Sequence, residues 1–180
     1  TGAAATIGHG LASAPTMIIV KNRSATNPWW VYNATLGAGK QLRLNDTNAE
    51  GSDGGVIWNN TAPTSSVFSV NSNTGSNGSG NSLIAYCFKS VESYSKVGSY
   101  TGNGEVMYDA SGFTSSTFGV RGGATGVNVN GATQVSYCFH DVANYSKFGS
   151  YSGNGSTTGP VVTLGFSPAF VMIKRGDAVE

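Results

Sequence analysis

The sequence predicts an all-β fold, most specifically an antiparallel β-sandwich of the jelly-roll kind. Short segments rich in β-branched and aromatic residues recur along the chain, and Gly, Asn, Ser and Pro separate them at intervals of about ten residues. No window of twelve or more residues carries an apolar stripe of helical period. One long phrase occurs twice, which indicates an array of similar modules.

The first expected strands lie near the start of the chain. Residues 16–21 read TMIIVK, a β-branched run that follows a proline. Residues 29–32 read WWVY, and strand geometry places Trp30 and Tyr32 on one face and Trp29 and Val31 on the other. Both faces of this second strand are therefore apolar. One face belongs to the core, and the other must be covered or must bind something.

Later segments continue the β pattern. The stretch from Ser90 to Tyr94 is expected to form one helical turn at most, because helix breakers surround it. The remaining segments are short and apolar, and several of them alternate as half-buried strands do. They are residues 65–70, 82–88, 118–120 and 160–166.

Composition narrows the class of protein. Gly, Ser, Thr and Asn make up 82 of the 180 residues, and only 19 residues are charged, which is well below the usual share of about a quarter. The net charge of +1 offers no basic excess for a nucleic-acid partner. No apolar run is long enough to insert into a membrane. Uncharged strand faces of this kind are typical of extracellular and virion proteins. Because lysines are few, the strand edges are weakly protected against pairing with a neighbouring chain.

An internal repeat is the strongest signal. Residues 86–104 and 137–155 are identical at thirteen of their 19 positions, at a spacing of 51. The order of the repeated phrases predicts three modules. Residues 1–98 form the first, residues 99–149 a shortened second that packs with the first into one sandwich, and residues 150–180 the start of a third. We therefore expect the chain to be a piece of a longer polypeptide.

The two cysteines occupy equivalent places in the repeat. Cys87 and Cys138 both lie in a Tyr-Cys-Phe phrase, so repetition explains their spacing. A free thiol packed in a strand is the favoured interpretation, and a disulfide between the two is the alternative. His9 and His140 lie in unlike contexts, so the sequence does not predict a zinc site.

No pattern predicts catalysis, and we expect the protein not to be an enzyme. Nucleophilic hydrolysis needs a Ser or Cys with a His and an orienting acid. His9 lies in a Gly-His-Gly turn and His140 precedes Asp141 after a Tyr-Cys-Phe phrase, and we expect both to be surface residues. Glycoside hydrolysis needs two carboxylates across a cleft. A glycan-degrading enzyme would require a pair of facing carboxylates from a scattered set, namely Asp46, Glu50, Asp53 and Asp109.

The segment 45–53 is rich in oxygen ligands. Calcium takes six to eight oxygens, and Asp46, Glu50 and Asp53 are its candidate ligands here. The spacing differs from that of an EF-hand, and a polar hairpin loop is the alternative. No other cofactor is expected.

Four aromatic residues are candidates for binding a glycan. Sugar rings stack on exposed aromatic rings, while Asn and Asp side chains hold the hydroxyls. The candidates are Trp29, Trp30, Tyr32 and Trp58. Alternatively, these rings cover a small core or a contact between modules.

Three phrases of the chain resemble a known family. They are AYCFKSVESYSKVGSYTGNG, LGFSPAFVMIKR and the pair IIVKNRS and WWVYNATLGAGKQLRLNDTNAE. They resemble a repeat domain of unknown function found in tail and virion structural proteins of marine bacteriophages. The resemblance covers nearly the whole chain and implies a concanavalin A-like, laminin-G-like sandwich with glycan binding. The second module departs from it, because it lacks the Pro-led half.

Together these observations predict a virion-surface or tail-fibre module that mediates attachment without catalysis. Its expected partners are a host-surface glycan, other virion subunits or further copies of itself. The alternative is a purely structural capsid-decoration or filament subunit, in which Trp29 and Trp30 would be buried between subunits.

Overall fold

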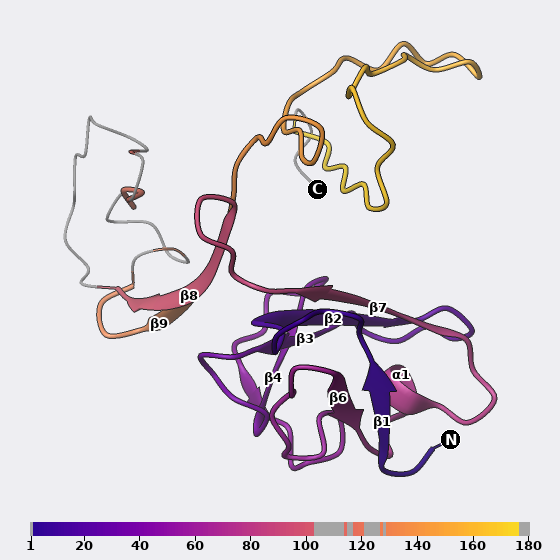
Figure 1. The fold of residues 1–180 in the computed structure, drawn as a ribbon, viewed down its shortest axis with the longest axis vertical. Helices are drawn as coiled ribbons and strands as arrows, with labels where there is room; N and C mark the ends of the chain where they lie inside the picture. The colour runs from indigo at the N-terminus through magenta and orange to yellow at the C-terminus, as the bar shows by residue number, and fades with distance from the viewer. Residues whose placement is uncertain (1, 103–113, 115–116, 121–126, 128, 177–180) are drawn as a thin grey trace. The chain divides into compact units, whose positions relative to one another are not determined.

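The computed structural model describes residues 2–102, 114, 117–120, 127 and 129–176 (Figure 1). It divides into two units, Thr1–Cys138 and Phe139–Glu180. Strands dominate the first unit, and the registers that join its strands are antiparallel. The prediction of an all-β fold is therefore confirmed.

A five-stranded sheet forms the centre of the first unit, in the order β5-β4-β3-β2-β7. Every neighbouring pair in it is antiparallel. The strands are β2 (Met17–Asn22), β3 (Trp30–Asn33), β4 (Lys40–Arg43), β5 (Gly51–Ser52) and β7 (Leu83–Phe88).

The strand β2 has a neighbour on both edges because its sequence suits the middle of a sheet. Ile19 pairs with Val31 on β3 and with Tyr86 on β7, so β-branched and aromatic side chains meet across both ladders. Five of the six residues of β2 are buried, and Lys21 is the exception. The expectation of a strand over 16–21 is confirmed.

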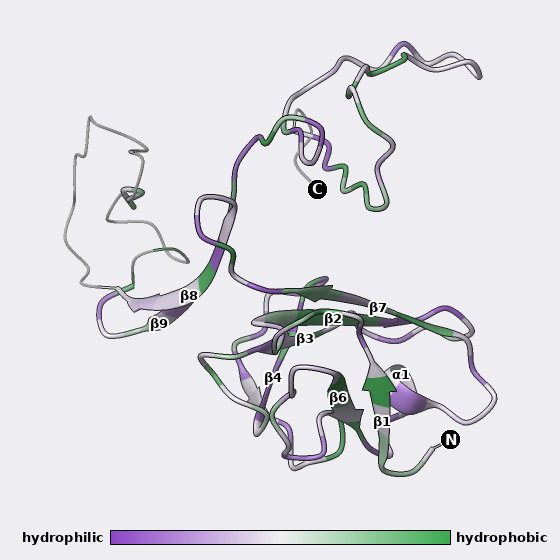
Figure 2. Ribbon diagram, viewed as in Figure 1, coloured by the Kyte–Doolittle hydropathy of each residue, from purple (hydrophilic) through white to green (hydrophobic). Residues whose placement is uncertain are grey.

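The first core cluster lies between this sheet and a strand pair made of β1 (Ala5–Gly8) and β6 (Val67–Val70). Its members come from both layers, and α1 and the segment before β6 close its sides (Figures 1 and 2). They are Ile18, Val20, Trp30, Tyr32, Ala38, Ile57, Trp58, Phe68 and Val70.

The second core cluster covers the opposite face of the sheet. Met17, Ile19 and Val31 are buried there with Val97 of β8 (Ser95–Thr101). Tyr137 of β9 (Thr133–Phe139) packs against them, and burial raises the pKa of its phenol. Trp30 and Tyr32 thus point to one face and Val31 to the other, as the alternation predicts.

Two local expectations differ from the structure. Residues from Ser90 to Tyr94 form a tight turn closed by a bridge between Val91 and Ser95, and Ser93 has φ 62°. The helical turn lies instead at α1 (Thr74–Asn77), where the side chain of Asn73 accepts a hydrogen bond from the Gly75 amide at 2.8 Å. An N-cap therefore outweighed the low helix propensity of this stretch.

The second unit has an extended course without a described strand over 160–166, contrary to expectation. No ladder joins this segment to a neighbour in the part of the chain that the structure describes, and Val161 is 93% exposed. Of residues 118–120, only Phe118 takes part in a β-bridge. Among the described residues, no helix reaches the length and hydropathy of a membrane span.

Candidate functional site

Three of the four aromatic candidates are core residues. Trp30, Tyr32 and Trp58 are 6%, 4% and 1% exposed. The Tyr32 and Trp58 rings meet edge to face with centroids 5.8 Å apart, and the Arg43 guanidinium lies 5.1 Å from the centroid of the Trp30 ring. These rings offer no open face to a sugar. Their positions match the alternative interpretation, in which they cover the core.

Trp29 is the fourth candidate, and it is half-buried at the edge of the second core cluster. Hydrogen bonds to the adjacent residues Leu44 and Asn45 hold its backbone. The Trp29 amide donates to Oδ1 of Asn45 at 2.9 Å, and the Trp29 carbonyl accepts from the Leu44 amide at 3.0 Å. Both backbone polar groups of Trp29 are therefore satisfied within the protein.

An open groove of about 700 Å³ lies beside Trp29. Its floor comes from β2 and β7, where Lys21 pairs with Ile84 and the next pair on the same face is Ile19 with Tyr86. Val20 pairs with Trp30, so Trp29 lies next to Lys21 on this face. Its remaining wall is the loop after β2, residues 23–26.

The loop wall is held by hydrogen bonds at both ends. Asn22 is buried, and its side chain accepts from the Ser24 amide at 2.8 Å and donates to the Thr74 carbonyl at 2.8 Å. The Ser82 amide donates to Oγ of Ser24 at 2.9 Å, and the Arg23 amide donates to the Ser82 carbonyl at 2.8 Å. The wall is therefore tied to the start of β7 and to α1.

Two aromatic rings and several polar groups line the groove. Trp29 and Tyr86 supply the rings, and Ser24, Thr26 and Lys21 supply polar groups. No carboxylate or histidine is among the described residues that line the groove. This arrangement can hold a ring that is apolar on its faces and polar at its edge, and it contains no pair of groups for acid–base chemistry.

The calcium candidates each have a separate protein partner. Asp46 pairs with Arg43 at 3.2 Å, and the Asn48 amide and then Arg43 lower the pKa of its carboxyl. Glu50 pairs with Lys40 at 2.9 Å. Asp53 is buried, and both of its oxygens accept backbone amides. Within the described parts of the chain, no three acidic, histidine or cysteine side chains gather as metal ligands do.

Of the carboxylates named for a glycosidase, the three that are described bind different partners: Glu50 binds Lys40, Asp46 binds Arg43 and Asp53 accepts the Ile57 amide. Asp109 lies outside the described residues. Both histidines contact backbone. His9 accepts the Leu11 amide on Nδ1 at 3.0 Å and lies 3.1 Å from the Thr64 carbonyl through Nε2, while His140 Nδ1 lies 2.6 Å from the Asp141 carbonyl.

A comparison with family models matches one family to the chain twice, over residues 1–108 and 105–180. The two matches together span the sequence. The chain belongs to the DUF7483 family. That family is described as a domain of unknown function. The two matches meet at residues 105–108, and the structure divides after Cys138. The module boundaries near residues 98 and 149 stay predictions.

No curated protein and no solved structure matches this DUF7483 chain.

Each of the two DUF7483 matches contains one copy of a short turn, which we call the YSK turn: residues 89–97 and 140–148. In both copies a valine amide donates to a serine carbonyl at 3.1 Å, from Val91 to Ser95 and from Val142 to Ser146. The same serine donates its hydroxyl back across the turn, to the carbonyls of Lys89 at 3.0 Å and His140 at 2.6 Å. The repeated letters therefore fold into the same local structure.

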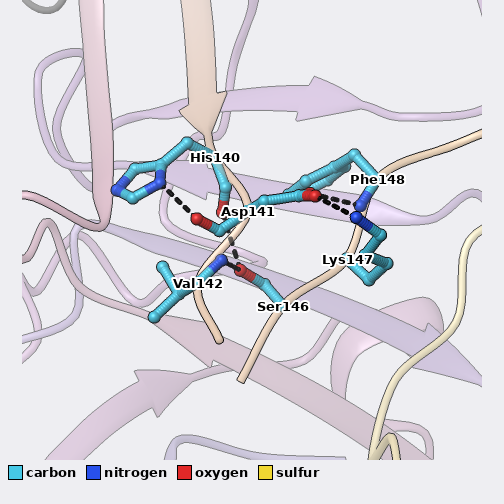
Figure 3. A network of polar contacts seen from close by, with 6 residues as sticks. All are labelled: His140, Asp141, Val142, Ser146, Lys147 and Phe148. Carbon is cyan, nitrogen blue, oxygen red and sulfur yellow. Dashed lines mark hydrogen bonds and ion pairs between the residues drawn. The ribbon is translucent and has the colours of Figure 1, made fainter. Parts of the chain in front are cut away.

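The two YSK turns of this DUF7483 chain differ in one acceptor (Figure 3). In the second turn, Asp141 accepts the Phe148 amide at 2.6 Å and pairs with Lys147 at 2.6 Å. In the first turn, the equivalent Ser90 accepts the Val97 amide on its hydroxyl at 3.0 Å. The sequence alone showed the repeat but gave no sign of this turn, because its bonds involve backbone groups and a left-handed residue.

Proposed function

We propose that this DUF7483 chain is a non-enzymatic module that binds carbohydrate in the groove beside Trp29. The half-buried indole of Trp29, fixed next to Tyr86 and a polar loop, is the observation that carries the proposal. The faces of a pyranose ring are lined by C–H groups, which pack on aromatic rings, while the hydroxyls at its edge need polar partners. The groove supplies both.

The setting that we propose is the surface of a bacteriophage virion, in a tail fibre or another appendage that attaches to a host. The resemblance of the YSKxGSYxGNG and PAFVMIKR phrases to phage structural proteins supports this setting. A jelly-roll sandwich is part of the same proposal. The enclosure of the first core cluster between the five-stranded sheet and the β1–β6 pair supports that architecture.

A structural role is the second candidate, and one observation favours it. In the second unit, Val171, Met172 and Ile173 are 61%, 65% and 67% exposed. Adjacent exposed apolar residues of this kind mark surfaces that other proteins cover. In this version the chain is a capsid-decoration or filament subunit, and its partners are other virion subunits or copies of itself.

A glycan array tests the carbohydrate proposal directly. We expect the full chain to bind a subset of surface polysaccharides, and Trp29→Ala to lose that binding by a factor of at least about ten. Tyr151→Ala is the matched control, because it removes a half-exposed aromatic ring from the second unit. Trp29→Tyr keeps a ring and should retain part of the affinity.

The proposal is wrong if no glycan binds, or if Trp29→Ala binds as the unaltered chain does. Because Trp29 also packs against the second core cluster, thermal unfolding of each variant must accompany the array. A Trp29→Ala chain that unfolds at the same temperature and loses binding supports a role in recognition. A chain that assembles into oligomers in solution without binding any glycan favours the structural role instead.

A further inference from the structure

The charged side chains that line the groove are both cations. They are Lys21 and Arg23, and the described lining contains no Asp or Glu. The whole chain has a net charge of only +1, so this local excess does not reflect a basic protein. A neutral sugar would need no such pair of uncompensated charges.

Lys21 is held in place with part of its donor capacity free. Its ammonium donates to the Asn27 carbonyl at 2.9 Å, which fixes the side chain beside Trp29. An ammonium has three N–H donors, so this bond leaves two for a ligand. A carbonyl acceptor is uncharged, and none of the described carboxylates forms an ion pair with Lys21.

Arg23 has its backbone fixed and its guanidinium open to the groove. The Arg23 amide donates to the Ser82 carbonyl, whereas its exposed side chain forms no ion pair with any described carboxylate. Elsewhere in the first unit, Lys40 and Arg43 are paired with carboxylates. A guanidinium offers two parallel N–H groups that match the two oxygens of a carboxylate or sulfate.

We propose that the groove selects an acidic saccharide, with the sugar ring on Trp29 and its carboxylate or sulfate held by Arg23 and Lys21. The inference rests on the proposed function, since it names the class of ligand for the same groove. An aromatic ring and two cations could also hold a nucleotide of single-stranded DNA. Grooves that bind such strands carry cations along the path of several phosphates, and the described lining holds only these two.

The test compares pairs of ligands in which one member carries an acidic group and the other has that group esterified or removed. An oligomer of galacturonic acid and its methyl ester share every ring hydroxyl, and a sulfated galactan and its desulfated form give the second pair. We expect the full chain to bind at least one acidic member about tenfold more tightly than its neutral counterpart by isothermal calorimetry. That difference should shrink as NaCl rises from low to physiological concentration.

Two variants assign the preference to the groove. Arg23→Gln and Lys21→Gln remove the charge and leave a shorter polar side chain, so each should reduce the preference for the acid severalfold by weakening binding of the acid more than binding of the neutral ligand. Lys96→Gln is the control, because Lys96 is an exposed cation of β8 outside the groove.

Three results would overturn the inference. Equal binding of the acid and the ester, abolished by Trp29→Ala, leaves the carbohydrate proposal standing and removes the acidic class. Tighter binding of an oligothymidylate than of any sugar assigns the groove to nucleic acid. A preference for acid that persists in both Gln variants places the charge recognition elsewhere on the chain.

Discussion

Asp53 and Trp58 are joined in the core of the first unit, where Oδ2 of Asp53 accepts the backbone amide of Trp58 at 2.9 Å. Oδ1 of the same carboxylate accepts the Ile57 amide at 2.8 Å. All three residues are buried, with exposures of 3% or less. The carboxylate therefore closes the loop that carries Trp58 into the first core cluster, and both its oxygens are occupied by the protein itself.

We predict that Asp53→Ala lowers the free energy of unfolding by about 3 kcal/mol, because it removes two charged hydrogen bonds and leaves two buried amides without acceptors. Asp53→Asn should cost less, since an amide oxygen still accepts one of them. Urea denaturation of the full chain measures both. Glu50→Gln is the control, and its exposed ion pair with Lys40 should be worth less than about 1 kcal/mol. Equal losses for Asp53→Ala and Glu50→Gln would contradict the assignment.

The role of Asp53 shows where sequence reasoning ends. Alternation along residues 29–32 correctly separates Trp30 and Tyr32 from Val31, because strand geometry fixes which side chains share a face. It does not say which face is covered. That depends on the segment around Trp58, which lies far along the chain and is brought in by Asp53.

The groove beside Trp29 is a second feature that the sequence predicts only in part. The sequence singled out Trp29 but not Lys21 or Tyr86, because these residues lie on β2 and β7, more than 60 positions apart. Only the register of the sheet places them together. For residues 160–166 the prediction of a strand is wrong for a different reason. Their apolar pattern is typical of a strand, but a strand also needs a hydrogen-bonded neighbour, and none of the described strands pairs with them.

Gly75 is predicted to tolerate no side chain. A β-carbon at this position would collide with Nε1 of Trp30, whose ring is buried in the first core cluster. The ring cannot move aside without displacing its neighbours, so Gly75→Ala should destabilise the first unit by about 1–3 kcal/mol. Gly80→Ala is not a clean control, because Gly80 has positive φ, whereas Gly98 has open space around it.

Thermal unfolding monitored by tryptophan fluorescence measures this effect. Gly75→Ala should lower the melting temperature by several degrees, and Gly98→Ala should change it little. Indistinguishable melting temperatures for the two variants would show that Trp30 does not pack tightly on α1.

Cys87 is predicted to react slowly with thiol reagents. It is a half-buried free thiol of β7 that packs against the first core cluster, and burial raises its pKa above the ordinary value. Because the thiolate is the reactive form, the native protein should hold less of it at pH 8 than an unfolded chain. Because the pKa of Cys87 is higher in the folded state than in the unfolded chain, the unfolded state loses the proton first. The free energy of unfolding therefore declines as the pH rises above the pKa of Cys87 in the unfolded chain.

The measurement uses a Cys138→Ser variant, so that Cys87 alone reacts with an aromatic disulfide reagent. We expect the native rate to be at least about tenfold below the rate in denaturant at the same pH. If the native and denatured rates agree, the thiol of Cys87 is not shielded.

The two YSK turns are predicted to differ in their response to acid. In the second turn, the hydrogen bond from Lys147 and then that from the Phe148 amide lower the pKa of Asp141. A lowered folded pKa stabilises the turn above the unfolded Asp value, near about 4, and that stabilisation is lost as the pH falls through the folded pKa. The Phe148 amide resonance should therefore titrate with a midpoint below the value of an unstructured Asp. In the first turn the Val97 amide donates to the hydroxyl of Ser90, which does not titrate, so the Val97 amide resonance is the internal control.

Asp141→Asn should abolish the Phe148 transition and leave Val97 unchanged. A Phe148 midpoint at or above the ordinary Asp value, or an equal shift of Val97, would show that the Asp141 contacts do not form in solution.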